Sequence, residues 1–239
     1  MLYAFYLMSH DNIAGLEQKI GITFANKDNL LQALTHRSYI NENTDWHLDH
    51  NERLEFLGDA VLELAVTEYL YNNYPDKPEG EMTNWRAALV NAVMLAKISE
   101  KFNLNDYILL SRGEARDTGR ARQYILANAV EAVIGSIYID SGYGKCKEFI
   151  DKFIIDELNE IIENRLYKDF KSLFQEEAQD RVGITPSYEV IKEWGPDHAK
   201  TFKVGLFLEK ELVAEGEGKS KQEAQQDAAK NALDKKGWD

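Results

Sequence analysis

The sequence is poor in the residues that cross-link a chain, and it offers no segment to anchor one in a lipid bilayer. Its 239 residues include one cysteine, Cys146, which cannot form an intrachain disulfide, so we expect a reducing compartment. No uncharged apolar run approaches the ~18 residues of a membrane span. The apolar first eight residues lack a basic leader and a small-residue cleavage site. These absences predict a soluble, cytoplasmic protein with no membrane partner.

Basic residues are also scarce. The chain has 28 Lys and Arg against 41 Asp and Glu, a formal net charge of -13, which taken alone argues against nucleic acid as a partner. The excess is uneven, because residues 168–239 hold 12 basic and 15 acidic residues while residues 1–167 hold 16 and 26. Four prolines, fifteen glycines and a hydrophobic fraction of 44% exclude collagen-like, low-complexity and disordered chains.

Two kinds of hydrophobic pattern divide the chain. Apolar residues recur at helical spacing in 51–71, 84–102, 124–139 and 145–165. After about Lys168 a short helical pattern gives way to strict alternation of apolar and polar residues in 202–209, which predicts a strand. Partner strands are expected at 188–194 and 211–215, with a turn at 195–198. A capping box from Ser220 to Glu223 then begins a last helix. We therefore predict an all-α domain at 1–164, a linker at 165–168 and an α+β domain of order α-β-β-β-α at 168–238.

The segment HNERLEFLGDAVLEL, residues 50–64, gathers carboxylates on one side of its predicted helix. At 100° per residue Glu52, Glu55, Asp59 and Glu63 fall within an arc of about 80°. Like charges at this spacing destabilise a helix, and a shared cation would relieve the repulsion. Two plainer interpretations stay open: Glu52 could complete a capping box begun by Asp49, or the acidic face could simply be solvated.

A second predicted helix, ILANAVEAVIG at 125–135, favours the cation. It carries Asn128 and Glu131 at i and i+3 among apolar residues, where burying either side chain without a partner is costly. Oxygen ligands suit a hard cation such as magnesium, and the thiolate and imidazole spacing of a zinc site is absent. The five histidines show no pairing that suggests a nucleophile, and we interpret His36 and His50 as structural.

These segments carry a family resemblance. HNERLEFLGDAVL resembles the signature of the ribonuclease III family, and ILANAVEAVIG resembles its second catalytic segment. PEGEMTNWRAALV at 78–90 resembles the stretch between them, and the last seventy residues resemble a double-stranded-RNA-binding domain. The order is that of a bacterial ribonuclease III, with the catalytic motifs between about residues 12 and 142. The resemblance implies a homodimeric endonuclease that cleaves double-stranded RNA with Mg²⁺, which Mn²⁺ is expected to replace. The products would carry 5′-phosphate and 3′-hydroxyl ends, and the substrates would be ribosomal RNA precursors and structured messenger and transfer RNA transcripts.

The resemblance also implies roles for individual residues. Glu55, Asn128 and Glu131 would contact magnesium, with Asp59 in the same set. Asp59 and Glu131 match the positions usually described as catalytic, and Glu52 matches one linked to substrate and metal placement. Two further acidic residues are less defined: Glu79 matches a position near the scissile strand, and Glu63 matches none, which favours a salt bridge or a solvated face.

One departure bears on activity. The family usually has Asp where this chain has Asn128, whose amide oxygen can ligate magnesium but brings no charge, so we expect weaker metal binding. A double-stranded-RNA-binding protein that has lost catalysis is therefore one rival interpretation. An acidic helical protein that buffers calcium or magnesium is another, although it leaves the sequences GPDH and KSK near the C-terminus without a role.

The RNA-binding domain of the family contacts double-stranded RNA at three places and recognises the duplex mainly by its shape. The matching positions are Ser172, Gln175 and Glu176 in the first helix; Gly195, Pro196 and His198 in the first inter-strand loop; and Lys219, Ser220 and Lys221 at the positive end of the last helix. KSK alone would suit an ordinary helix start. Gln222 stands where a basic residue is usual, and the candidate dimer surface lies around Phe56 and Leu57.

Overall fold

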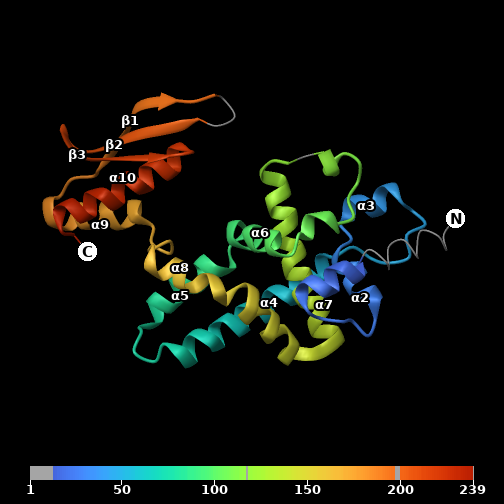
Figure 1. The fold of residues 1–239 in the computed structure, drawn as a ribbon. Coiled ribbons are helices and arrows are strands. Elements are labelled where there is room, and N and C mark those ends of the chain that lie inside the picture. Colours follow the sequence, from blue (N-terminus) through green and yellow to red (C-terminus); the bar gives the residue numbers. More distant parts are fainter. Residues whose placement is uncertain (1–12, 117, 197–199, 239) are drawn as a thin grey trace. The chain divides into compact units, whose positions relative to one another are not determined.

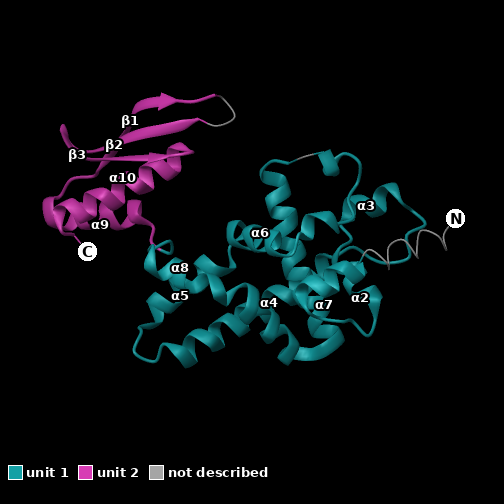
Figure 2. Ribbon diagram, viewed as in Figure 1, with its two compact units in different colours: residues 1–167 teal, residues 168–239 magenta. Residues whose placement is uncertain are grey.

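The computed structural model describes residues 13–116, 118–196 and 200–238 (Figure 1). The chain divides into two compact units, residues 1–167 and 168–239 (Figure 2), which we describe one at a time. None of the described helices is long and apolar enough to cross a membrane.

The regular structure described in the first unit is helical, as predicted, apart from one isolated bridge between Thr35 and Leu109. Residues 13–20 form a helix. The elements that follow are α2 (Lys27–Ala33), α3 (Arg37–Glu42), α4 (Glu52–Asn73), α5 (Glu79–Val90), α6 (Ala92–Lys101), α7 (Arg120–Phe153) and α8 (Leu158–Glu163), with short 3-10 turns at Leu104–Asp106, Glu114–Arg116 and Ile155–Glu157.

Two helices differ from the sequence prediction. The predicted helix at 84–102 is two helices, because Asn91 takes an extended backbone (ψ 158°) and its side chain caps α6 by accepting from the Met94 amide at 2.9 Å. The predicted helices at 124–139 and 145–165 are separated within α7 at Gly142, whose φ of 78° and ψ of 177° are not helical, and the second one ends at Phe153, before the 3-10 turn and α8. Only glycine takes that conformation readily, so α7 changes direction there without a loop.

The helices α4 and α7 cross in backbone contact. A Cβ atom added to Gly58 of α4 would lie 1.8 Å from the carbonyl oxygen of Glu131, and one added to Gly135 of α7 would lie 2.1 Å from that of Leu54. Each glycine therefore admits the main chain of the other helix. The buried core of the unit surrounds this crossing and includes Val61, Leu62, Val130 and Ile134.

The second unit has the predicted order α9 (Phe170–Val182), β1 (Ser187–Trp194), β2 (Thr201–Leu208), β3 (Glu211–Gly218) and α10 (Lys221–Lys236). The three strands form one antiparallel sheet in the order β1-β2-β3. The helices cover the face on which Leu206, Leu208 and Val213 are buried. β3 runs three residues beyond its predicted end, and a Cβ atom on Gly216 would lie 2.1 Å from the amide nitrogen of Ala228. The GEG sequence thus lets α10 pack closely on the sheet.

The chain at residues 165–168, which the sequence suggests as a linker, is mostly held by the first unit. The backbone amides of Arg165 and Leu166 donate to the carbonyl oxygens of Ile162 and Ile161, and the ring of Tyr167 packs against Trp85. The compact units meet at the next residue, Lys168.

Candidate functional site

The first carboxylate of the candidate site stands at the start of α4. α4 begins at Glu52 itself, with Asn51 as its N-cap and no side-chain cap, so the suggested capping box from Asp49 to Glu52 is wrong. The carboxylate of Glu52 lies 3.6 Å from Nη1 of Arg37 and 3.8 Å from Nδ1 of His50. Glu52 is therefore an exposed carboxylate that lies beside a guanidinium group and an imidazole ring.

The crossing of α4 and α7 brings four of the predicted residues together. Glu55 and Asp59 each follow a crossing residue of α4, and Asn128 and Glu131 lie on the facing part of α7. The side chain of Asn128 is hydrogen-bonded to Glu55, and the charges of Asp59 and Glu55 both act on Glu131. Of the acidic face of α4, Glu52 and Asp59 are exposed, as a solvated surface would be, whereas Glu55 is half-buried together with Asn128 and Glu131 of α7.

Electrostatics within this group are unfavourable to full ionisation. Burial first, and then the negative charges of Asp59 and Glu55, raise the pKa of Glu131 to about 7. The pKa of Glu55 is also raised, by burial and by the charges of Glu52 and Asp59, while its hydrogen bond with Asn128 opposes the rise. Carboxylates held close in a partly buried place are suited to share a cation, which would remove this cost.

The donor set of the group fits a hard cation and not a softer one. Within the described parts of the chain, no three His, Cys, Asp or Glu side chains are placed so that they could hold a metal ion by themselves. A cation here would also draw on the amide oxygen of Asn128, beside Glu55 and Glu131, and on water. Such an all-oxygen set, completed by water, is what Mg²⁺ prefers.

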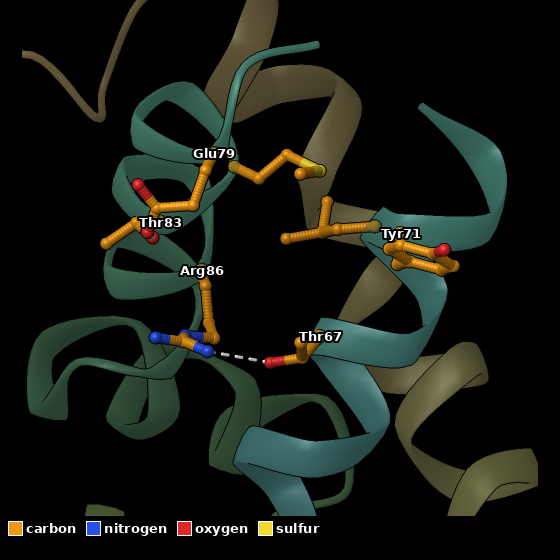
Figure 3. A pocket seen from close by; sticks show the side chains of 7 residues that line it. Thr67, Tyr71, Glu79, Thr83 and Arg86 are labelled. Carbon is orange, nitrogen blue, oxygen red and sulfur yellow. Dashed lines mark hydrogen bonds between the residues drawn. The ribbon is translucent and has the colours of Figure 1, made fainter. Parts of the chain in front are cut away.

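Two other predicted acidic residues lie apart from this group. Glu63 forms a salt bridge with Arg86 of α5 at 3.0 Å, which confirms one of the two roles expected for it. Glu79 lies in the first turn of α5, where Thr83 donates to it at 2.8 Å. Figure 3 shows Glu79, Thr83 and Arg86 on one wall of a pocket of about 280 Å³, with Thr67 of α4 on the other and accepting from Arg86 at 2.8 Å. Sequence patterns missed Arg86 because its partners are 19 and 23 residues away on another helix.

The structural interpretation of His36 is confirmed. Its ring caps α3 by accepting from the Ser38 amide at 3.3 Å, and Nδ1 lies 2.8 Å from the Ser38 hydroxyl. Burial lowers the pKa of His36, which favours the neutral ring that this acceptor role requires.

In the second unit, the predicted residues of α9 lie near the start of α10. Gln175 and Glu176 are exposed, and Ser172 donates its hydroxyl to Asp169 at 3.0 Å. Lys171 ties the two helices together, because its Nζ donates to Oε1 of Gln225 at 2.7 Å.

Gly195 and Pro196, which follow β1, and the start of α10, which follows β3, lie at the same end of the sheet. Gly195 (φ 98°) and Pro196 are exposed just before the loop, and His198 lies outside the described residues. At the same end, Phe202 of β2 pairs with Gly218, and Nζ of Lys221 lies 5.9 Å from the Phe202 ring centroid.

The start of α10 is capped as predicted. The hydroxyl of Ser220 accepts from the Glu223 amide at 3.1 Å, and the carboxylate of Glu223 accepts from the Lys219 amide at 2.8 Å. The side chains of Lys219 and Lys221 both belong to exposed residues at this positive helix end.

Comparison with known proteins gives matches to both units. A family profile described as Ribonuclease-III-like matches residues 26–158, and one described as Double-stranded RNA binding motif matches residues 170–236. The chain is 47% identical over 224 residues to Ribonuclease 3 of Natranaerobius thermophilus, covering 94% of this chain and 96% of that protein. It is 44% identical over 216 residues to Ribonuclease 3 of Borreliella burgdorferi, covering 90% and 88%. A solved nuclease domain of ribonuclease III from Campylobacter jejuni, described as flexible in a region involved in dimer formation, is 41% identical with a TM-score of 0.55 and covers 60% of this chain and 96% of that one.

Proposed function

The chain belongs to the ribonuclease III family, and we propose that it cleaves double-stranded RNA by magnesium-dependent hydrolysis that leaves 5′-phosphate and 3′-hydroxyl ends. Its activity as an endoribonuclease follows from the family. The observation that carries the metal-dependent mechanism is the crossing of α4 and α7, which places Glu55, Asp59, Asn128 and Glu131 side by side.

The residues of the site have different proposed roles in metal binding, catalysis and substrate positioning. When bound, magnesium lowers the pKa of a water molecule and offsets charge at the phosphate and at the leaving oxygen. Glu55, Asn128 and Glu131 would hold it through oxygen atoms, and manganese would fit the same donors. Asp59, the exposed member, would complete the metal set and matches the position that is catalytic in the family. Glu52, beside Arg37 and His50, positions the substrate.

Proton and metal compete at Glu131. Its pKa of about 7 means that near neutral pH a proton must leave before the carboxylate can bind a cation. The uncharged amide of Asn128 weakens the attraction for the cation compared with an aspartate. We therefore expect cutting that needs more magnesium than relatives with Asp at this position, and that falls as the pH drops below 7.

The second unit would bind the RNA duplex. The polar side chains of Ser172, Gln175 and Glu176 suit the hydroxyl-lined minor groove of A-form RNA, and the loop of Gly195, Pro196 and His198 would enter the next one. Lys219 and Lys221 flank Ser220 at the positive end of α10, where a phosphate is favoured. Placing these few charges correctly matters more than the net charge of the unit.

We further propose a homodimer, with one active site for each strand of the duplex. The support is Phe56 of α4, which is 81% exposed, while its predicted companion Leu57 is half-buried and packs on the core. Phe56→Ser should therefore shift the protein from dimer to monomer in sedimentation velocity, whereas a dimer unaffected by this change would place the interface elsewhere. Glu79 is proposed to help position the strand being cut. The substrates would be ribosomal RNA precursors and structured messenger and transfer RNA transcripts of a bacterial cytoplasm.

A cutting assay tests the function. A long RNA duplex is incubated with the full chain with and without Mg²⁺, beside Glu131→Gln and the matched variant Glu63→Gln. We expect Mg²⁺-dependent fragments from the parent and from Glu63→Gln, and retained RNA binding without cutting from Glu131→Gln. A parent that protects the duplex but leaves it intact at millimolar Mg²⁺ would contradict the nuclease and favour the binding-only protein that Asn128 suggests.

A further inference from the structure

The chain is fixed to the first unit up to Tyr167. α8 ends at Glu163, and the next residues turn back on it: the amide of Arg165 donates to Ile162 O at 3.2 Å and that of Leu166 to Ile161 O at 2.9 Å. The ring of Tyr167 then packs edge-on against Trp85, with 6.1 Å between centroids and 81° between planes.

Trp85, on which that ring packs, is itself fixed in the core of the first unit. It is 1% exposed in the middle of α5 and also meets Tyr74, at the end of α4, with 4.9 Å between ring centroids. One residue further along α5, Arg86 donates to Thr67 and pairs with Glu63, both on α4. Tyr167 therefore rests on a helix that is joined at two places to the helix carrying Glu55 and Asp59.

The second unit holds its own end of the chain from Asp169 onward. Asp169 caps α9 by accepting from the Ser172 amide at 3.2 Å and also accepts from Nε2 of Gln226 of α10 at 2.8 Å. The hydrogen bond from Gln226 is the largest of several that lower the pKa of Asp169, so the residue stays ionised in this role. Lys168 is the one residue between the two fixed positions, and two steps of chain span at most about 7 Å.

We propose that Tyr167 is a positioning residue for RNA cleavage. Because Trp85 holds its ring, the tether to the RNA-binding unit, meaning the chain that is not held by either unit, is limited to Lys168. A duplex held by the second unit then meets the carboxylates of the first as an intramolecular partner, at an effective concentration set by tether length. This inference rests on the proposed function. It predicts that a longer tether weakens capture of the duplex and leaves the chemical step unchanged.

The size of the effect follows from tether length. Lengthening a flexible tether from about two to about eight residues lowers the effective concentration as the three-halves power of length, about eightfold. The lengthened protein should then show a KM for duplex RNA raised by about that factor, with kcat unchanged. A less constrained second unit should also spread the positions at which an end-labelled duplex is cut.

The experiment compares full-length variants at saturating Mg²⁺. One carries a six-residue Gly-Ser insertion after Lys168, which leaves every contact of Tyr167 and Asp169 in place. Tyr167→Ala releases the anchor, Tyr167→Phe keeps its ring, and Leu166→Ala changes a neighbouring side chain that is 55% exposed. We expect a higher KM and scattered cuts from the insertion, a smaller change of the same kind from Tyr167→Ala, and parent behaviour from the last two.

Each contrary result has a distinct meaning. An insertion variant with the KM and the cutting positions of the parent would overturn the inference. A Tyr167→Ala protein with a lower kcat and the KM of the parent would also overturn it, because the ring would then support the helices that carry the carboxylates and not the tether. A parent that cuts no duplex fails the proposed function itself, whatever the tether variants do.

Discussion

Replacing Glu131 by Gln should make the metal-free protein more stable at alkaline pH. In the parent, Glu131 must ionise while half-buried beside Asp59 and Glu55, which raises its pKa from 4.5 to about 7. Glutamine has nearly the same shape and never carries the charge. Ionisation of Glu131 therefore destabilises the folded parent, and the variant lacks this destabilisation.

The magnitude follows from the pKa. Between pH 4.5 and 7 the folded parent holds a proton that the unfolded chain has released, so its free energy of unfolding falls as pH rises through that window. At about 1.4 kcal/mol per unit the loss reaches about 3 kcal/mol above pH 7, and partial solvent access makes this an upper bound. For a unit of this size, that corresponds to a Tm about 6–12 °C higher for Glu131→Gln at pH 8.5, with no difference at pH 4.5.

Thermal unfolding with a chelator present measures this directly. Trp46 and Trp85 report on the first unit once Trp194 and Trp238 are replaced by Phe in both proteins. Added Mg²⁺ should raise the Tm of the parent at pH 8.5 and leave Glu131→Gln almost unchanged. Equal stability of the two proteins at pH 8.5, or equal stabilisation by Mg²⁺, would refute the electrostatic account of the site.

Three more outcomes are expected. Asn128→Asp should cut at a lower half-saturating Mg²⁺ concentration than the parent, since it restores a charged ligand; an unchanged magnesium titration would argue against Asn128 as a ligand. Gly58→Ala should cost about 3 kcal/mol or more in urea unfolding, because its Cβ would lie 1.8 Å from a backbone oxygen, whereas Gly144→Ala meets nothing within 4 Å and should not destabilise. Gln222→Lys should steepen the salt dependence of RNA binding by about one unit of slope, and an equal slope would remove α10 from the phosphate contacts.

Local sequence signals predicted the elements well where one pattern governs a segment. The alternation in β2 and the capping box of Ser220 and Glu223 act over a few residues, so they can be identified without the rest of the fold. The break at Asn91 was missed because the apolar spacing continues across it, while the extended backbone and cap depend on how α5 and α6 pack. The break after Phe153, where a 3-10 turn and α8 replace the rest of the helix predicted at 145–165, was missed for the same reason, because apolar spacing continues across it.

The candidate site shows the same division. Helical spacing alone placed Glu55 and Asp59 on one face, and the apolar setting of Asn128 and Glu131 indicated that they need partners. The hydrogen bond between Asn128 and Glu55 joins residues 73 positions apart, which only the crossing of two helices determines. The pairing of Arg86 with Glu63 and the seat of Tyr167 on Trp85 arise in the same way.

The crossing at Gly58 and Gly135 separates what can vary in this protein from what cannot. The distance between α4 and α7 is set where main chain meets main chain, by atoms that every amino acid shares. These two glycines are therefore the positions of the crossing that tolerate no side chain, since a Cβ atom at either one would collide with the main chain of the other helix.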